Sequence, residues 1–127
     1  MSRGVRPGPP PLVVQVFGRE DHQDTRAALR FFLERRIDIQ FIDLRRKPMA
    51  AGELRRFVER LGATEIADRA GRSWADAGLG YLRMSEAELA DRLLADQKLL
   101  RLPLVRIGNH CAAGRAEASW KALLGNA

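Results

Sequence analysis

Cysteine and histidine are scarce in this 127-residue sequence, which has one cysteine and two histidines. A single cysteine, Cys111, excludes an intrachain disulfide and a zinc site built from several cysteines. His22 and His110 lie far apart in the sequence, so no metal site and no bound metal are expected. The lone thiol is interpreted as a small, buried side chain of a strand rather than as a reactive group.

Long apolar runs are also missing, since no run approaches the roughly 20 residues that a membrane-spanning helix needs. Residues 1–11 are rich in proline and glycine and contain two arginines, but they lack the apolar stretch of a signal peptide. We therefore expect a disordered or extended leader over 1–11 and one folded domain over 12–127. The protein is expected to be cytoplasmic and to make no contact with membranes.

Lysine is rare and occurs only at Lys47, Lys98 and Lys121, whereas arginine supplies the rest of the 22 basic residues. The net charge of +6 and the isoelectric point of about 10.6 permit anionic partners: nucleic acid, an oxyanion or an acidic protein surface. The arginines are spread along the chain among aspartates and glutamates, which is typical of a solvated surface of mixed charge. Nucleic-acid binding is therefore the less favoured alternative, and it would require an affinity that falls steeply with salt.

The first part of the chain has the pattern of a strand, a helix and a second strand. Residues 12–17 form a short apolar run rich in β-branched side chains, which predicts a buried strand. A helix is expected over 23–36, with Asp21 or Asp24 capping its start. Residues 38–43 alternate between apolar and polar, which predicts the second strand. A helix between two strands implies a parallel pair joined by a right-handed crossover.

The middle of the chain, from about residue 50 to residue 97, is predicted to be a helical insertion. Apolar residues at i, i+3, i+4 and i+7 indicate a helix over 51–61, and a short helix is expected over 64–70. Ser85 and Glu88 have the spacing of a capping box, which predicts the start of another helix.

Two short strands are predicted near the C-terminus, over 103–107 and 110–112, with a turn at Gly108 and Asn109 between them. A last helix follows. The order β-α-β, helical insertion, β-β-α predicts an α/β domain with a four-stranded mixed sheet and helices on its faces. Core packing is expected for three large aromatic side chains outside the strands, Trp74, Tyr81 and Trp120.

This order and several local motifs resemble the ArsC/Spx family, whose members are arsenate-reductase-like proteins with a thioredoxin fold. In that family a strand and a tight turn precede a loop with a nucleophilic cysteine, a second Cys or Ser, an arginine and a helix. The matching stretch here is residues 17–29. His22 falls at the position of the nucleophile, Thr25 falls at the second position, and Arg26 is retained. The resemblance implies a divergent member that lacks the catalytic cysteine.

Three further segments carry the likeness, at residues 41–45, 68–74 and 100–105, and the resemblance covers roughly residues 12–124. It implies a cis peptide bond before Pro103, where the thioredoxin fold has one. The family's arginine directly before this proline is replaced by Leu102.

The resemblance also implies an oxyanion pocket at the start of the first helix. Free backbone amides of residues 23–26 would form it together with Arg26, Arg69 and Arg115. The alternative is a vestigial loop with His22 on the surface, and the sequence leaves both interpretations open.

The replacement at position 22 bears directly on activity. The family's arsenate reductases need a thiolate at the helix start, where exposed amides and the helix dipole lower its pKa. The imidazole of His22 cannot form a thiol–arsenic adduct or a mixed disulfide with glutathione. A catalytically inactive or altered protein is therefore expected.

The resemblance thus favours a binding module for a protein partner or a small oxyanion, with no cofactor. One alternative is an arsenate-reductase-like or glutathione-dependent oxidoreductase that uses Cys111 or an external thiol. Another is an Spx-like transcription regulator that binds RNA polymerase, and other members of the group are associated with nitrogenase gene clusters. The sequence leaves open whether the protein is an enzyme.

Overall fold

The computed structural model describes residues 12–125, so the predicted leader over 1–11 lies outside the described residues. No helix in this part of the chain is long and apolar enough to cross a membrane. The strands are β1 (Val13–Gly18), β2 (Asp38–Asp43), β3 (Leu104–Ile107) and β4 (His110–Ala113). The helices are α1 (Gln23–Glu34), α2 (Ala51–Leu61), α3 (Ala63–Ile66), α4 (Arg72–Asp76), α5 (Glu86–Ala95) and α6 (Glu117–Gly125). Two short 3-10 helices are η1 (Leu79–Tyr81) and η2 (Gln97–Leu99).

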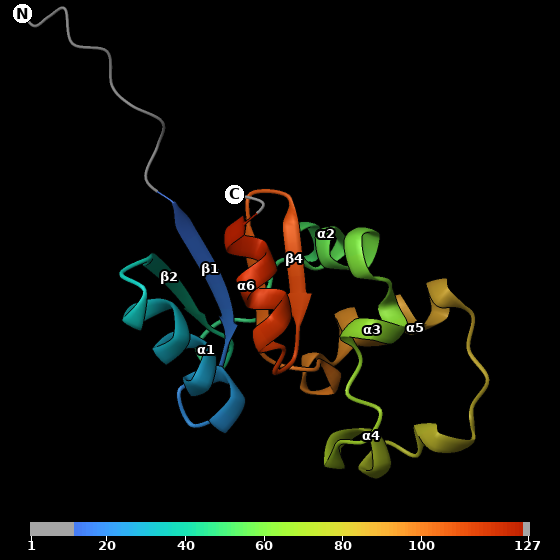
Figure 1. The fold of residues 1–127 in the computed structure, drawn as a ribbon. Helices are drawn as coiled ribbons and strands as arrows, with labels where there is room; N and C mark the ends of the chain where they lie inside the picture. The colour runs from blue at the N-terminus through green and yellow to red at the C-terminus, as the bar shows by residue number, and fades with distance from the viewer. Residues whose placement is uncertain (1–11, 126–127) are drawn as a thin grey trace, which may run out of the picture.

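The four strands form one mixed sheet in the order β2-β1-β3-β4 (Figure 1). β1 is parallel to β2 and antiparallel to β3, and β3 is antiparallel to β4. At the end of β1, Phe17 is aligned with Ile42 on one side and with Leu104 on the other. The predicted α/β architecture with a four-stranded mixed sheet is therefore confirmed.

Alternation along β1 divides the core into two layers. Val14 and Val16 pack with Phe32 of α1 and Trp120 of α6 on one face of the sheet. Phe17 points to the other face, into a cluster built by α2, α3, α4 and α5. Each fully buried side chain of this size stabilises the fold by about 1.5–3 kcal/mol. Both faces of the sheet are covered, and the inserted helices form the second layer (Figure 1).

The boundaries of two helices, α1 and α3, differ from the predicted ones. The first helix was expected to reach residue 36, but α1 ends at Glu34, because Arg36 has φ 57° and cannot continue a right-handed helix. The short helix expected over 64–70 is the four-residue α3. Gly62, with φ 85°, separates it from α2.

The start of α5 follows the predicted capping box. The Glu88 amide donates to Ser85 Oγ at 3.1 Å, and the Ser85 amide donates to the Glu88 carboxylate at 2.9 Å. Met84 and Leu89 pack in the same apolar cluster, which ties the start of this helix to the core.

Of the three aromatic side chains that were expected in the core, Trp74 and Trp120 are buried. The expectation for Tyr81 is wrong, because 97% of its surface is exposed. Leu79 takes the buried position of η1 instead, and the 3-10 turn directs Tyr81 away from the core.

Candidate functional site

A pocket of about 750 Å³ lies where β1 ends and α1 begins. Its walls come from the loop after β2, the start of α4, the segment around η2, and the turns before β3 and after β4. The cationic residues that line it are Arg19, Arg72, Lys98, Arg101 and Arg115. The carboxylates are those of Asp24, Asp68 and Asp96. The excess of cationic side chains favours an anionic ligand.

The first turn of α1 is capped by His22. Its Nδ1 accepts a hydrogen bond from the Thr25 amide at 3.2 Å and lies 2.9 Å from Thr25 Oγ1. The predicted caps Asp21 and Asp24 are wrong, because the helix begins at Gln23 and Asp24 lies inside its first turn. The imidazole therefore takes the place of the short polar side chain that normally caps a helix.

This cap determines which nitrogen of His22 carries the proton. An amide N–H can only donate, so Nδ1 is unprotonated and the neutral ring has its proton on Nε2. Burial and the nearby Arg19 guanidinium lower the pKa of His22 below 6.5, although Asp24, Asp21 and Asp68 oppose this shift. His22 is thus neutral at pH 7. It lines the pocket with an Nε2–H that has no protein partner in residues 12–125.

Thr25 anchors this turn against the sheet. Its side chain is fully buried, and its hydroxyl oxygen accepts a long hydrogen bond of 3.4 Å from the Arg19 amide. Gly18 leaves the space that Thr25 fills, since a Cβ atom at position 18 would lie 2.6 Å from Thr25 Cγ2. The pocket end of α1 is therefore held directly against the end of β1.

The three arginines that were predicted to bind an anion lie in different surroundings. Arg26 is exposed and donates to the Glu20 carbonyl at 3.2 Å. Arg69 lies over the Trp74 ring, 5.6 Å from its centroid. Neither of them lines the pocket, whereas Arg115 does.

Arg115 is only loosely paired within the pocket wall. Its guanidinium lies 3.8 Å from the Asp24 carboxylate and 3.5 Å from that of Glu117. About half of its side chain is exposed, so both ion pairs are weak and can be exchanged for a ligand.

Three arginines of the pocket were missing from the predicted set: Arg19, Arg72 and Arg101. Arg19 directly follows β1, and its Nε lies 3.7 Å from the Asp21 carboxylate. The Nε atoms of Arg19 and Arg101 are buried without a hydrogen-bond acceptor in the described part of the chain. Arg101 Nη2 donates to Glu65 at 2.9 Å and to the Ala113 carbonyl at 3.1 Å. The sequence could have identified Arg19 as a pocket residue, because it follows a predicted central strand. Ligands of α/β sheets bind at the carboxyl ends of such strands.

The segment before β3 completes the pocket. The Leu102–Pro103 peptide bond is cis, and Leu102 lines the pocket beside Arg101.

Cys111 lies away from this pocket. It sits in β4 opposite Arg106, which is in turn opposite Gln15 of β1. Gln15 precedes Gly18 by three residues, which corresponds to roughly 10 Å along the strand. The thiol is half-buried in the cluster on the α2 side of the sheet, and this burial raises its pKa above 9.0. The only cysteine of the sequence therefore does not line the pocket at the start of α1.

A family model described as "ArsC family" matches residues 18–123. The chain belongs to the ArsC family. The match includes the whole pocket, from Arg19 to Arg115. No curated protein matches the sequence.

Several solved structures share this ArsC fold at low sequence identity. An arsenate reductase from Vibrio cholerae is 18% identical, with a TM-score of 0.74 over 91% of this chain and 98% of the other. An ArsC family related protein from Bacteroides fragilis is 18% identical, with a TM-score of 0.78 over 87% of this chain and 96% of the other. An arsenate reductase (ArsC) related protein from Brucella melitensis is 20% identical, with a TM-score of 0.67 over 92% and 98%. The predicted relation to the arsenate-reductase-like fold is thereby confirmed.

Proposed function

We propose that this ArsC-family protein binds an anion, or an anionic group of a partner protein, in the pocket at the start of α1, and that it does not reduce arsenate through a thiol. The observation that carries the proposal is the composition of the pocket. Five cationic side chains and a neutral imidazole line it, and no cysteine does.

Chemistry explains why the missing thiol matters. Reduction of arsenate to arsenite consumes two electrons, which thiols supply when they are oxidised to a disulfide. An imidazole can donate or accept a proton, but it has no comparable electrons to give. The half-buried Cys111 has a raised pKa, and little of it is thiolate at neutral pH.

The same pocket is well supplied with donors for an anion. His22 offers its Nε2–H, and the side chains of Arg19 and Arg101 line the pocket with 42% of their surface exposed. Arg115 can leave Asp24 at little cost, because their separation is 3.8 Å. Hydrogen bonds from guanidinium groups to anions are among the stronger ones in proteins. A volume of about 750 Å³ also leaves room for the larger molecule that carries the anionic group.

A reductase assay tests the negative half of the proposal. The wild-type protein, incubated with arsenate, glutathione and a thiol-regenerating system, is expected to form no more arsenite than a protein-free control. A matched assay uses Cys111→Ser. Arsenite formation by the wild type that is lost in Cys111→Ser would establish the oxidoreductase alternative and overturn the proposal.

Titration with phosphate, sulfate and arsenate tests the positive half. Backbone amide NMR shifts are expected to change in a saturable way around Arg19, His22 and Arg115. Arg115→Ala should weaken binding about tenfold, as expected for the loss of a charge-assisted hydrogen bond of roughly 1.4 kcal/mol. Arg30→Ala, at an exposed position of α1, is the matched control and should bind like the wild type. Equal affinities of the two variants would contradict binding in this pocket.

A further inference from the structure

The outer edge of β4 is a second candidate binding surface, because its backbone groups are not paired with another strand of the described sheet. β4 is the last strand in the order β2-β1-β3-β4, so only one of its two edges is paired within the sheet. α2 packs on one face of β4 and α6 on the other (Figure 1). The two helices flank the strand without adding another strand to it.

Antiparallel geometry shows which backbone groups point outward from β4. Ile107 and His110 are paired across a two-residue turn, so they form a hydrogen-bonded pair. The next pair, Arg106 and Cys111, is therefore a non-hydrogen-bonded pair. Consequently, both the N–H and the C=O of Cys111 point to the free edge, and neither has a hydrogen-bond partner in the part of the chain that the structure describes.

Ala113 is the next residue whose backbone groups point outward. Its carbonyl accepts the hydrogen bond from Arg101, whereas its N–H has no partner in residues 12–125. The edge therefore ends at Ala113, and its open part is centred on Cys111.

Two adjoining hollows, of about 280 and 330 Å³, follow this edge. Both are lined by Arg60, Asn109 and Cys111. The first extends along α2 to Arg56, and the second extends along α6 to Leu123. Together they form a groove, the β4 groove, that runs beside an unpaired strand edge.

The β4 groove has more cationic than acidic side chains, since the carboxylate of Glu59 also lines it. Arg56 and Arg60 are exposed and form no ion pair within residues 12–125. Arg106 is already bound, because its guanidinium contacts Glu53 at 3.2 Å and the Gly108 carbonyl at 2.7 Å. The positive charge of the groove therefore comes from the two arginines on α2, and the exposed Glu59 offsets only part of it.

These charges discriminate between possible occupants. A second copy of the chain, paired edge to edge, would bring the arginines of both copies together, and the repulsion would oppose the dimer. The chain's own residues 1–11 include four prolines, which have no N–H to donate, and two further arginines. An extended segment with acidic side chains satisfies both the open edge and the charge.

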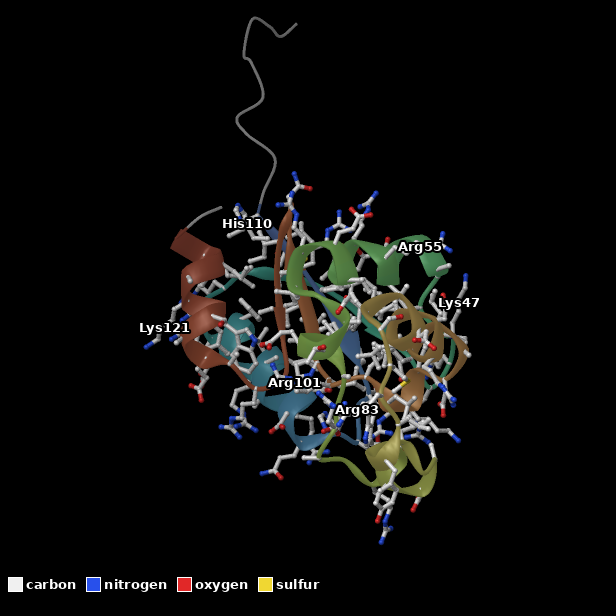
Figure 2. The ribbon with its side chains drawn as sticks, turned by 90° about the vertical axis from the view of Figure 1, so that its right-hand side faces the viewer. Lys47, Arg55, Arg83, Arg101, His110 and Lys121 are labelled. Atoms are coloured by element: carbon white, nitrogen blue, oxygen red, sulfur yellow. The ribbon has the colours of Figure 1, made fainter. Side chains whose placement is uncertain are left out.

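We propose that the β4 groove binds an extended acidic segment of another protein, which adds to the sheet as a fifth strand beside β4 and pairs its carboxylates with Arg56 and Arg60. This site is distinct from the pocket at the start of α1. Figure 2 shows His110, at the beginning of β4, at one end of the molecule, while Arg101 lies farther toward the pocket end.

Selection from a random 12-residue peptide library displayed on phage, with the full-length protein immobilised, tests the proposal. The expected peptides combine acidic residues with β-branched ones. The best of them, synthesised and labelled, should bind Arg60→Glu at least about tenfold more weakly than the wild type and should bind Arg30→Glu equally well. Enrichment of basic or neutral peptides, equal binding to Arg60→Glu, or no enrichment at all would overturn it.

Hydrogen exchange of the Cys111 amide checks the strand pairing itself. Saturation with the selected peptide is expected to slow this exchange at least about tenfold. N-methylation of the alternate peptide residues whose N–H groups face β4 should abolish binding. His22→Ala removes a pocket residue and should leave peptide affinity unchanged. Unchanged exchange at Cys111, or loss of binding in His22→Ala, would place the peptide elsewhere and overturn the proposal.

Discussion

The contact between Gly18 and Thr25 decides whether α1 can begin where it does. Gly18→Ala would place a Cβ atom 2.6 Å from Thr25 Cγ2, and the buried Thr25 side chain has no room to withdraw. We expect the free energy of unfolding to fall by about 1–3 kcal/mol, as for other overpacked sites. Urea denaturation measures this change.

Gly52→Ala is the matched control for that substitution. Gly52 lies in α2, and a Cβ atom there would meet nothing within 4 Å. Alanine should leave stability unchanged or raise it by about 0.4–1 kcal/mol, because it restricts the unfolded chain. If both variants unfolded at the same urea concentration, the steric account of Gly18 would be wrong.

The pKa of His22 makes stability depend on pH. In the folded state the pKa of His22 is below 6.5. Between pH 6.5 and that lower pKa, the unfolded chain therefore binds more protons than the folded protein. The stabilisation is therefore fully present above pH 6.5 and is lost as the pH falls toward the lower pKa of the folded state. Urea denaturation at a series of pH values should show this loss.

His22→Asn retains a side chain that can cap the helix but does not titrate. Its unfolding free energy should depend less on pH than that of the wild type between pH 7.5 and pH 5. His110→Asn, at the exposed first position of β4, is the matched control and should keep the wild-type dependence. An unaltered pH dependence in His22→Asn would contradict the proposed tautomer and its cap.

At the scale of elements, a single glutamine ties η2 to the loop before α2. Gln97 Nε2 donates to the Met49 carbonyl, and Gln97 Oε1 accepts from the Met49 amide, both at 2.7 Å. Gln97→Ala would leave both backbone groups of the buried Met49 unpaired. We expect a loss of about 1–3 kcal/mol in the free energy of unfolding, measured in urea.

Gln40→Ala provides the comparison for the Gln97 contact. Gln40 forms an exposed hydrogen bond with Gln15, and its loss should change stability by no more than about 0.5 kcal/mol. A Gln97→Ala variant as stable as Gln40→Ala would show that η2 is held by its apolar contacts alone.

At the scale of the whole molecule, the sheet keeps the thiol and the pocket apart. Cys111 is half-buried beneath α2 with a raised pKa, so iodoacetamide should alkylate the native protein at pH 7.5 at least about tenfold more slowly than the unfolded chain. Mass spectrometry follows the reaction, and free glutathione in each buffer is the control. Native and unfolded rates that agreed after this correction would contradict the described environment of Cys111.

The net charge of the whole molecule says less about its partners than the places where its cationic residues cluster. The net charge of +6 is compatible with several kinds of anionic partner. The structure concentrates cations at two separate places: the pocket at the start of α1 and the β4 groove. Residues as far apart in sequence as Arg19 and Arg115 meet at the first of them.

The sequence by itself determined the order of the strands and of the longer helices, but not the short helices α4, η1 and η2. The strand over 38–43 and the helix over 51–61 have the predicted bounds, and the capping box at Ser85 and Glu88 forms as expected. These features depend on local periodicity and on contacts between residues a few positions apart, which a single sequence displays directly. The motifs spread along the chain also sufficed to indicate the ArsC fold, which the family match confirms.

Only the tertiary structure decided which side chains share the pocket and which face the solvent. It brought Arg19 and Arg101 to the pocket and left Arg26 and Arg69 outside it. It made His22 the helix cap and held Cys111 under α2. The physical reason is that these placements depend on the packing of segments far apart in the chain, because the same residue pattern is compatible with either face until the sheet and the inserted helices are assembled.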